Sequence, residues 1–349
     1  MSQTRRVLAV SMGEPAGIGT ELLYKAYETL KGSDCCFFTI DDPDRLSNLP
    51  ENLRGSVKTV AIRSAHDARS AFQEGLPVLP LSDEARESLS HVALGQPQAL
   101  TAQAVTASIE AGVQACANGD ASALVTLPIQ KSALLEAGFT FPGHTEFLGD
   151  LTAPLPMPDG GARGPVMMLA AEGFRAVPVT VHMALSAVPG ALTQALIVEH
   201  GMVTAQALAR DFGITSPRLA IAGLNPHAGE DGRMGTEDRD VIAPAIKTLQ
   251  DAGINAIGPM PGDTMFHPEA RERYDAALAM YHDQALIPIK TVAFHDAVNV
   301  TIGLPIVRTS PDHGTGLDIA GRGIARPDSL IAAMRMALSM AEARETHHA

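Results

Sequence analysis

The stretch AALAMYH, residues 276–282, is a short apolar run that ends in a histidine, and runs of this kind decide the fold. They are four to seven residues long and mostly apolar or β-branched, as in strands that are buried on both faces of a parallel sheet. The other five such runs are Arg6–Met12, Cys35–Ile40, Ala123–Thr126, Val177–Val181 and Leu219–Leu224.

Amphipathic stretches separate these runs and predict helices. They cover Gly19–Leu30, Leu100–Ala117, Leu192–Ala209, Thr236–Ala252 and Ser329–Glu345. Alternating strands and helices predict an α/β fold with right-handed crossovers. A chain of 349 residues is long enough for two domains, each with its own core.

The composition indicates a folded protein, since 46% of the residues are hydrophobic and 19% are charged. A formal net charge of −13 argues against a nucleic-acid partner, which would need a basic surface. No stretch approaches the roughly 18 apolar residues of a membrane span, so we expect no membrane partner. The three cysteines, Cys35, Cys36 and Cys116, form no CxxC pair, which indicates a reducing compartment. We therefore expect a cytoplasmic protein.

Three histidines follow strand-like runs: His182 ends PVTVH, His227 follows LAIAGLNP and His282 ends LAMYH. The carboxyl ends of strands in an open α/β sheet meet at the ligand crevice. Imidazole is a common ligand of zinc and related divalent metals, so a metal site is predicted. Because the histidines are far apart in sequence, the fold must assemble the site, within one chain or across two subunits. Asp263 and Asp283 could orient a histidine or complete the site.

The alternative is that these are ordinary histidines whose hydrogen bonds are satisfied within the fold. Five other histidines lack the strand-end context and are expected at the surface: His66, His91, His200, His347 and His348.

A set of cationic and polar residues is a candidate anion site. Lys290, Asn299 and Arg308 fall within 19 residues of a chain that is short of cations. Together with His144 and Thr145 they could bind a phosphate and a carboxylate, because arginine offers a bidentate fork and lysine a point charge. Lys290 ends the run LIPIK and Arg308 follows an apolar run, so both are expected at the mouths of strand-like segments. The alternative is that they are solvated surface side chains.

Two glycine-rich segments are candidate cofactor loops. Gly13–Glu21, GEPAGIGTE, follows a strand and opens a helix, where backbone amides can face an anion. Its spacing is not GxGxxG, so the dinucleotide fingerprint is missing, and a tight turn is the alternative. His313–Gly323, HGTGLDIAGRG, allows close backbone approach to a flat or phosphorylated ligand, and a mobile surface loop is its alternative.

Seven motifs, in order along nearly the whole chain, resemble the 4-hydroxythreonine-4-phosphate dehydrogenase family of vitamin B6 biosynthesis. They are Gly13–Gly19, Pro142–Phe147, Val166–Ala170, Gly223–Glu237, Gly258–Phe266, Ala279–Gln284 and Val298–Thr315. The resemblance implies an isocitrate/isopropylmalate-dehydrogenase-like fold of two α/β/α lobes, with the active site in the cleft between them. Lobe one would be residues 1–130 plus 300–349, on the cofactor side, and lobe two residues 131–299, on the metal, substrate and dimer side. A homodimer whose subunits share the active site is implied as well.

The resemblance also implies roles for the residues singled out above. The ligands of one divalent metal, zinc, magnesium or cobalt, are matched by His182, His227 and His282. The substrate-binding positions are matched by His144, Thr145, Lys290, Asn299 and Arg308. The HGTG segment resembles the cofactor loop of isopropylmalate dehydrogenases. We therefore expect NAD, or NADP in its place, at Gly13, Gly17, Gly19, His313, Gly314, Asp318 and Gly321.

The expected activity is NAD-dependent oxidation of 4-(phosphooxy)-L-threonine at C3, followed by decarboxylation to 3-amino-2-oxopropyl phosphate, in pyridoxal phosphate biosynthesis. The family pattern has Gly and His where this chain has Leu127 and Gln130, and a Gly-rich stretch where it has Phe294–Ala297. These departures keep other substrates open: a phosphorylated four-carbon sugar acid, 4-phospho-erythronate or 4-phospho-threonate, or a cis-dihydrodiol.

The general base is unassigned among Asp263, Asp283 and Lys290. Two other classes of protein remain as alternatives. One is a metal-dependent hydrolase or lyase that uses the three histidines to activate water. The other is a non-catalytic protein that binds a small phosphorylated acid.

Overall fold

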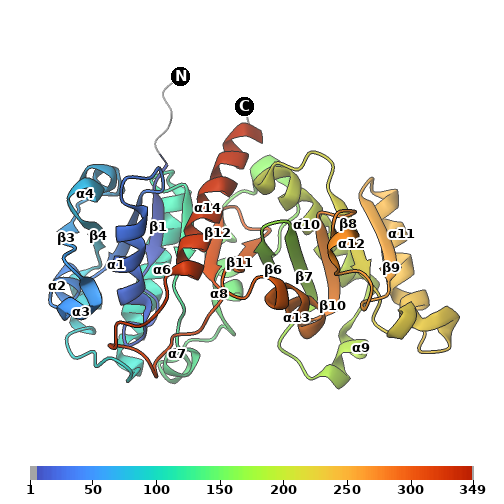
Figure 1. Ribbon diagram of the computed structural model, residues 1–349, viewed down its shortest axis with the longest axis horizontal. Coiled ribbons are helices and arrows are strands. Elements are labelled where there is room, and N and C mark those ends of the chain that lie inside the picture. The colour runs from blue at the N-terminus through green and yellow to red at the C-terminus, as the bar shows by residue number, and fades with distance from the viewer. Residues whose placement is uncertain (1–5, 348–349) are drawn as a thin grey trace. The chain divides into compact units, whose positions relative to one another are not determined.

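A computed structural model describes residues 6–347 of the chain, so His348 lies outside the described residues. The chain forms two compact units. One holds the chain up to Leu155 together with Ile306–Ala341, and the other holds Pro156–Pro305 and the chain from Glu342 onward. Each unit combines a sheet with helices, which confirms the α/β fold class (Figure 1). The predicted assignment of one lobe to the cofactor and the other to the metal, with its boundaries, stays a prediction.

The first unit has the strand order β3-β4-β2-β1-β5-β12, and all neighbours pair in parallel. Its strands are β1 (Leu8–Ser11), β2 (Phe37–Asp41), β3 (Thr59–Ala61), β4 (Leu76–Pro80), β5 (Ala123–Thr126) and β12 (Arg308–Pro311). The helices up to Leu155 are α1 (Gly19–Leu30), α2 (Pro43–Ser47), α3 (Glu51–Arg54), α4 (Ala68–Glu74), α5 (Asp83–Glu87), α6 (Ala102–Ala117), α7 (Lys131–Glu136) and α8 (His144–Thr152). After β12 the chain forms α14 (Asp328–His347). Every residue of β1, β2 and β5 is buried, which explains their continuous apolar runs.

The second unit has the strand order β11-β6-β7-β10-β8-β9. Its strands are β6 (Val166–Ala171), β7 (Phe174–Thr180), β8 (Arg218–Ala222), β9 (Asn255–Met260), β10 (Ala276–Tyr281) and β11 (Val298–Ile302). Its helices are α9 (Val188–Ala191), α10 (Gln194–Phe212), α11 (Ala243–Asp251), α12 (Pro268–Arg271) and α13 (His282–Val292). β6 pairs antiparallel with β11 and β7, and the other neighbours pair in parallel. The β6–β7 link is only Glu172 and Gly173, and a connection that short can join only antiparallel strands.

All six predicted strand runs contain strands, and all five predicted helices contain α-helices. The predicted helix at Thr236–Ala252 begins with a π-helical turn, η6 (Asp238–Ile242), before α11. The expectation that Lys290 ends a strand-like segment is wrong, because LIPIK lies inside α13. Leu286 and Ile289 are buried while Ile287 is 63% exposed, which is the spacing of a helix with one face on the core.

The three strand-end histidines follow neighbouring strands of the second unit. β7, β10 and β8 are adjacent and parallel, so their carboxyl ends lie along one edge of the sheet (Figure 1). His182 comes shortly after β7, and His282 follows β10 directly as the first residue of α13. His227 lies in the turn η5 (Pro226–Gly232) after β8. The fold therefore gathers these histidines at the edge where α/β sheets bind ligands.

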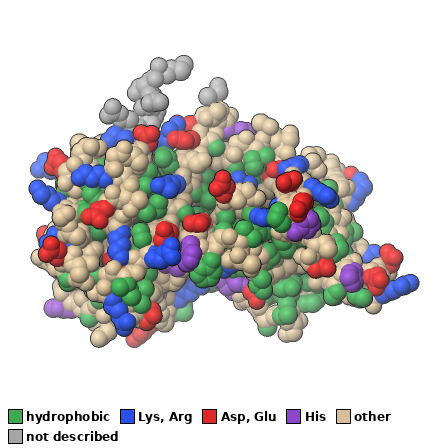
Figure 2. Space-filling model, viewed as in Figure 1, with side chains coloured by type: hydrophobic (Ala, Val, Ile, Leu, Met, Phe, Trp, Pro, Cys, Tyr) green, Lys and Arg blue, Asp and Glu red, His purple; other side chains and the backbone are tan. Residues whose placement is uncertain are grey.

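The surface in Figure 2 mixes acidic and basic side chains, so the excess of negative charge is not gathered into one patch on that face. Across residues 6–347, no helix has both the length and the apolar character needed to cross a membrane.

Candidate active site

Two of the strand-end histidines have a backbone conformation that is rare for residues with a side chain. The φ angles of His182 and His227 are +44° and +54°, in the left-handed region. This region costs an L-residue roughly 1–2 kcal/mol, and it persists only where the surrounding structure enforces it, often at functional sites. The conformation favours a functional role for both residues over that of ordinary histidines.

His182 and His282 lie together, with ring centroids 5.7 Å apart. The Nδ1 atom of His282 is 2.7 Å from an Asp283 carboxylate oxygen, at hydrogen-bond distance. A carboxylate that holds one ring nitrogen of a histidine fixes the ring and leaves the other nitrogen for a ligand. Asp283 therefore has the orienting contact that the sequence suggested for it.

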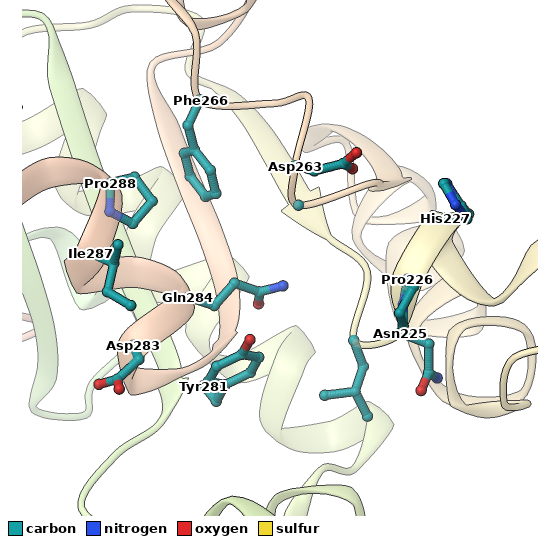
Figure 3. Close-up of a pocket in the computed structure, with 12 residues that line it drawn as sticks. Asn225, Pro226, His227, Asp263, Phe266, Tyr281, Asp283, Gln284, Ile287 and Pro288 are labelled. Carbon is teal, nitrogen blue, oxygen red and sulfur yellow. The ribbon is translucent and has the colours of Figure 1, made fainter. Parts of the chain in front are cut away.

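A cavity of about 510 Å³ lies beside the ends of β8 and β10. Its polar lining is Asn225, His227, Asp263, Tyr281, Asp283 and Gln284 (Figure 3). The side chain of Gln284 ties the two strands together at this point. Its oxygen accepts from the Met280 amide at 2.6 Å, and its nitrogen donates to the Gly223 carbonyl at 2.7 Å. The size and mixed lining suit a small polar ligand.

The donor chemistry of this region suits a divalent transition metal. Imidazole nitrogens are preferred by zinc and cobalt, and a carboxylate behind a ligand histidine is a usual companion. His182 and His282 stand close enough to belong to one site, whereas His227 lines the cavity with Asp263. Within residues 6–347 of a single chain, no three His, Cys, Asp or Glu side chains form a group that could hold a metal ion.

Arg308, in the first unit, is a buried cation. It begins β12, is 2% exposed, and donates from Nε and Nη2 to the Thr126 hydroxyl at 3.2 and 2.6 Å. Burial lowers the pKa of Arg308 to about 9. The alternative that Arg308 is a solvated surface side chain is thereby ruled out, and a bound anion would stabilise the buried guanidinium.

His144 belongs to the same electrostatic neighbourhood. It begins α8, and its Nε2 atom is buried without a hydrogen-bond partner among the described residues. Burial first, and then the positive charges of Arg308 and Lys131, hold the pKa of His144 well below its usual value. His144 is therefore neutral at physiological pH, and its Nε2 is free to meet a polar group of a ligand.

The first glycine-rich segment owes two of its glycines to close packing. At Gly13, where φ is +64°, a Cβ atom would lie 2.6 Å from Cβ of Leu127. At Gly17 it would lie 2.6 Å from the Thr315 carbonyl, and the Ile18 amide donates to that carbonyl at 2.9 Å. The contacts of Gly17 and Ile18 with Thr315 join the two predicted cofactor loops, and close packing accounts for both glycines without a ligand.

The departures at positions 127 and 130 also have local consequences. Leu127 is fully buried against Gly13. A Cβ atom built on Gly19 would lie 3.1 Å from Cδ1 of Leu127. The Gln130 side chain accepts from the Thr315 hydroxyl at 3.1 Å and donates to Ser132 at 2.9 Å. Gln130 therefore connects the segment after β5 to the second cofactor loop.

The remaining predicted site residues are placed as follows. Thr145 is the second residue of α8, in the first unit, while Lys290 in α13 and Asn299 in β11 belong to the second. The segment between β12 and α14 contains His313, Gly314, Asp318 and Gly321.

Sequence reasoning missed several polar residues of these regions: Thr126, Asn225, Tyr281 and Gln284. All four lie at or just beyond the carboxyl end of a strand, and that position was the available signal. The expectation that His200 lies at the surface is also wrong. His200 lies in α10 with a buried Nδ1 atom, and burial lowers the pKa of His200 to about 4.

The chain matches the family described as pyridoxal phosphate biosynthetic protein PdxA over residues 33–337. A protein from Caulobacter vibrioides named 4-hydroxythreonine-4-phosphate dehydrogenase is 53% identical over 341 residues, which cover 98% of this chain and 99% of that protein. A protein of the same name from Bradyrhizobium diazoefficiens is 48% identical, with 97% of each chain covered. The crystal structure of 4-hydroxythreonine-4-phosphate dehydrogenase from Klebsiella pneumoniae superposes with a TM-score of 0.84 at 34% identity, covering 96% of this chain and 99% of that one.

Proposed function

The chain belongs to the PdxA family of pyridoxal phosphate biosynthetic proteins, and we propose that it is a dehydrogenase of 4-(phosphooxy)-L-threonine that uses NAD and a divalent metal ion. Relatives named 4-hydroxythreonine-4-phosphate dehydrogenase match it over nearly its full length, which makes it an oxidoreductase. The observation that carries the proposal is the pair of His182 and His282 at the ends of adjacent parallel strands, with Asp283 on one ring.

The reaction removes a hydride from C3 of the substrate and a proton from the C3 hydroxyl, which leaves a β-keto acid. That acid loses CO₂ and gives 3-amino-2-oxopropyl phosphate. The protein must therefore hold a phosphate and a carboxylate, accept one proton and keep water from the reacting carbon.

We assign the phosphate to Arg308, His144 and Thr145. A buried guanidinium gives a phosphate charge-assisted hydrogen bonds, and the buried Nε2 of neutral His144 can donate to one of its oxygens. Contacts far from the reacting carbon supply binding energy that positions the substrate. Lys290 and Asn299 are proposed as further substrate-binding residues, as the resemblance implies.

His182, His227 and His282 would hold the metal ion, and the segments Gly13–Gly19 and His313–Gly323 would hold NAD, with NADP as the alternative. When bound, the metal supplies Lewis acidity to the substrate oxygen on C3, and NAD accepts the hydride. An imidazole donor set favours zinc or cobalt over magnesium, which prefers oxygen ligands.

For the proton of the C3 hydroxyl we propose Asp263. It lines the cavity beside His227 (Figure 3), whereas the Asp283 carboxylate contacts His282 and serves to orient that ring. Lys290 remains the third candidate. An Asp263→Asn variant keeps the shape of the side chain and removes its basicity, so kcat should fall with little change in KM.

We further propose a cytoplasmic homodimer in which His182 and His282 of one chain are joined by His227 of the partner subunit. The close His182–His282 pair supports this division of the ligands. The three cysteines, none of which forms a CxxC pair, support a reducing compartment.

A substrate panel read by NADH absorbance tests the proposal. 4-(Phosphooxy)-L-threonine should be oxidised far faster than 4-phospho-erythronate, 4-phospho-threonate or an aromatic cis-dihydrodiol. Faster turnover of any of those three would reassign the substrate. Hydrolysis or simple binding of the phosphorylated acid, with no NADH formed, would move the protein to another class.

A further inference from the structure

The turn that carries His227 is a run of left-handed residues. In η5 the φ angles of His227, Ala228, Glu230 and Asp231 lie between +42° and +55°, and Gly229 has a φ of +81°. Only glycine adopts this region without cost, and L-residues visit it singly rather than in runs. Four such penalties within five residues would unwind the turn unless contacts from outside it hold the chain in place.

Asp238 provides these contacts. It is the first residue of η6 and is 2% exposed. Its Oδ1 atom accepts from the Leu224 amide at 2.8 Å, and its Oδ2 atom accepts from the Asn225 amide at 3.1 Å and the Asn225 side chain at 2.8 Å. Three donors thus converge on one carboxylate, directly before the left-handed run begins.

Gly229, in the middle of the turn, also lies against the Asp238 carboxylate. The Met234 amide donates to the Gly229 carbonyl at 3.1 Å. A Cβ built on Gly229 would lie 3.3 Å from Oδ2 of Asp238, and one built on Gly223 only 2.6 Å from Oδ1. The backbone therefore wraps around the Asp238 carboxylate, and a smaller or rotated group there would leave buried amides unsatisfied.

We propose that Asp238 is a positioning residue, which holds the left-handed turn and so aims the His227 ring as a metal ligand. This inference rests on the proposed function, because the metal role of His227 does. Asp238 acts on His227 through the backbone of Leu224 and Asn225. A carboxylate suits this place because all three surrounding groups are donors and both of its oxygens are acceptors.

The test compares Asp238→Asn with Asp240→Asn in the full-length protein. Asp240 is in the same turn of η6, but it is exposed and pairs with Arg239, so it is the matched control. Binding of Co²⁺ is followed by its visible absorption bands, without substrate or NAD. We expect at least a tenfold loss of cobalt affinity in Asp238→Asn and no change in Asp240→Asn. Equal cobalt affinity of Asp238→Asn and the wild type would overturn the inference.

A second variant separates positioning from general destabilisation. Ala228→Gly, added to Asp238→Asn, removes one left-handed penalty without touching the carboxylate. We expect the double variant to regain several-fold cobalt affinity. If the single variant fails to fold, the double variant takes its place, and wild-type affinity in that protein would overturn the inference.

Trypsin cleavage after the exposed Arg233 reports on the turn with no metal present. Asp238→Asn should be cut there several-fold faster than Asp240→Asn, at a temperature well below unfolding. If the wild type binds no cobalt, the proposed function fails. The proteolysis result then decides the inference by itself, and equal cleavage rates count against it.

Discussion

At the scale of single residues, the proposed phosphate contact of Arg308 depends on the burial of its charge. It is nearly inaccessible to solvent, and it donates hydrogen bonds to the neutral Thr126 hydroxyl. Replacing Arg308 with Ala removes charge-assisted hydrogen bonds that are each about 1.5–3 kcal/mol, so kcat/KM for 4-(phosphooxy)-L-threonine should fall by roughly 100-fold.

The same substitution should leave 4-hydroxy-L-threonine, the analogue without phosphate, almost unaffected. Steady-state kinetics with both compounds make the comparison. Equal losses for the two substrates would remove Arg308 from the phosphate site.

His200 gives a pH-dependent prediction. Its pKa is about 4 in the folded chain because burial disfavours the charged ring, against 6.5 ordinarily, while a hydrogen bond to Pro178 acts in the opposite direction. In the unfolded chain His200 is therefore protonated near pH 6.5, whereas in the folded chain it is protonated only near pH 4. The contribution of neutral His200 to the free energy of unfolding is fully present above about pH 6.5. It is lost as the pH falls from about 6.5 to about 4.

Protonation of His200 in the unfolded chain should lower the free energy of unfolding by at most roughly 2 kcal/mol between pH 7 and pH 5. His200→Gln should lose less by about this amount, because glutamine does not titrate. Urea unfolding of both proteins at the two pH values measures the difference. Parallel losses in the two proteins would show that His200 is not the responsible group.

At the scale of elements, the packing of Gly13 against Leu127 is a test of local geometry. Gly13→Ala should destabilise the chain by about 2–4 kcal/mol, the sum of the left-handed penalty and the overlap with Leu127. Gly32→Ala is the matched control, since Gly32 also has positive φ, at +86°, but nothing within 4 Å of its Cβ position. That control should cost only about 1 kcal/mol. Thermal or urea unfolding gives both values, and similar costs would mean that the loop relaxes around the new methyl group.

The strands that could be predicted are those whose burial shows in the sequence. β1, β5 and β10 are buried on both faces and read as continuous apolar runs. β12 has the sequence RTSP and is equally buried. Its polar side chains form hydrogen bonds to residues distant in sequence, such as the bond from the Thr309 hydroxyl to the Ala333 carbonyl, so the local sequence does not predict a buried strand. The segment LIPIK, residues 286–290, resembles a strand because isoleucines lie on both sides of its proline. It is helical because Leu286 and Ile289 pack against the core.

The candidate site was predictable to a similar degree. The strand-end position of the histidines follows from the alternation of strands and helices, so His182, His227 and His282 could be singled out. The left-handed backbone of His182 and His227 could not, because positive φ is uncommon for every residue other than glycine. The contacts that enforce it, such as those of Asp238, come from residues that are distant in the chain or in other elements.

At the scale of the whole molecule, the proposed sharing of ligands between subunits predicts complementation. His182→Ala and His227→Ala should each be inactive as homodimers. When the two are mixed and allowed to exchange subunits, each mixed dimer contains one site with both defects and one site with none. The mixture should therefore reach about a quarter of wild-type activity, because half of the dimers are mixed.

Mixing His182→Ala with His282→Ala is the matched control. Both ligands are proposed to come from the same chain, so each mixed dimer has one defect in every site and should stay inactive. Recovery in the control, or none in the first mixture, would show that the ligands are divided differently.

The central claim is that three histidines hold a metal ion on which hydride transfer depends. The most direct measurement is NADH formation from 4-(phosphooxy)-L-threonine by wild-type and His227→Ala proteins, each stripped of metal by a chelator and then supplied with zinc or cobalt. We predict that stripped wild type is inactive and recovers with the metal, and that folded His227→Ala stays inactive in both conditions. Full activity of the metal-stripped His227→Ala protein would contradict the account.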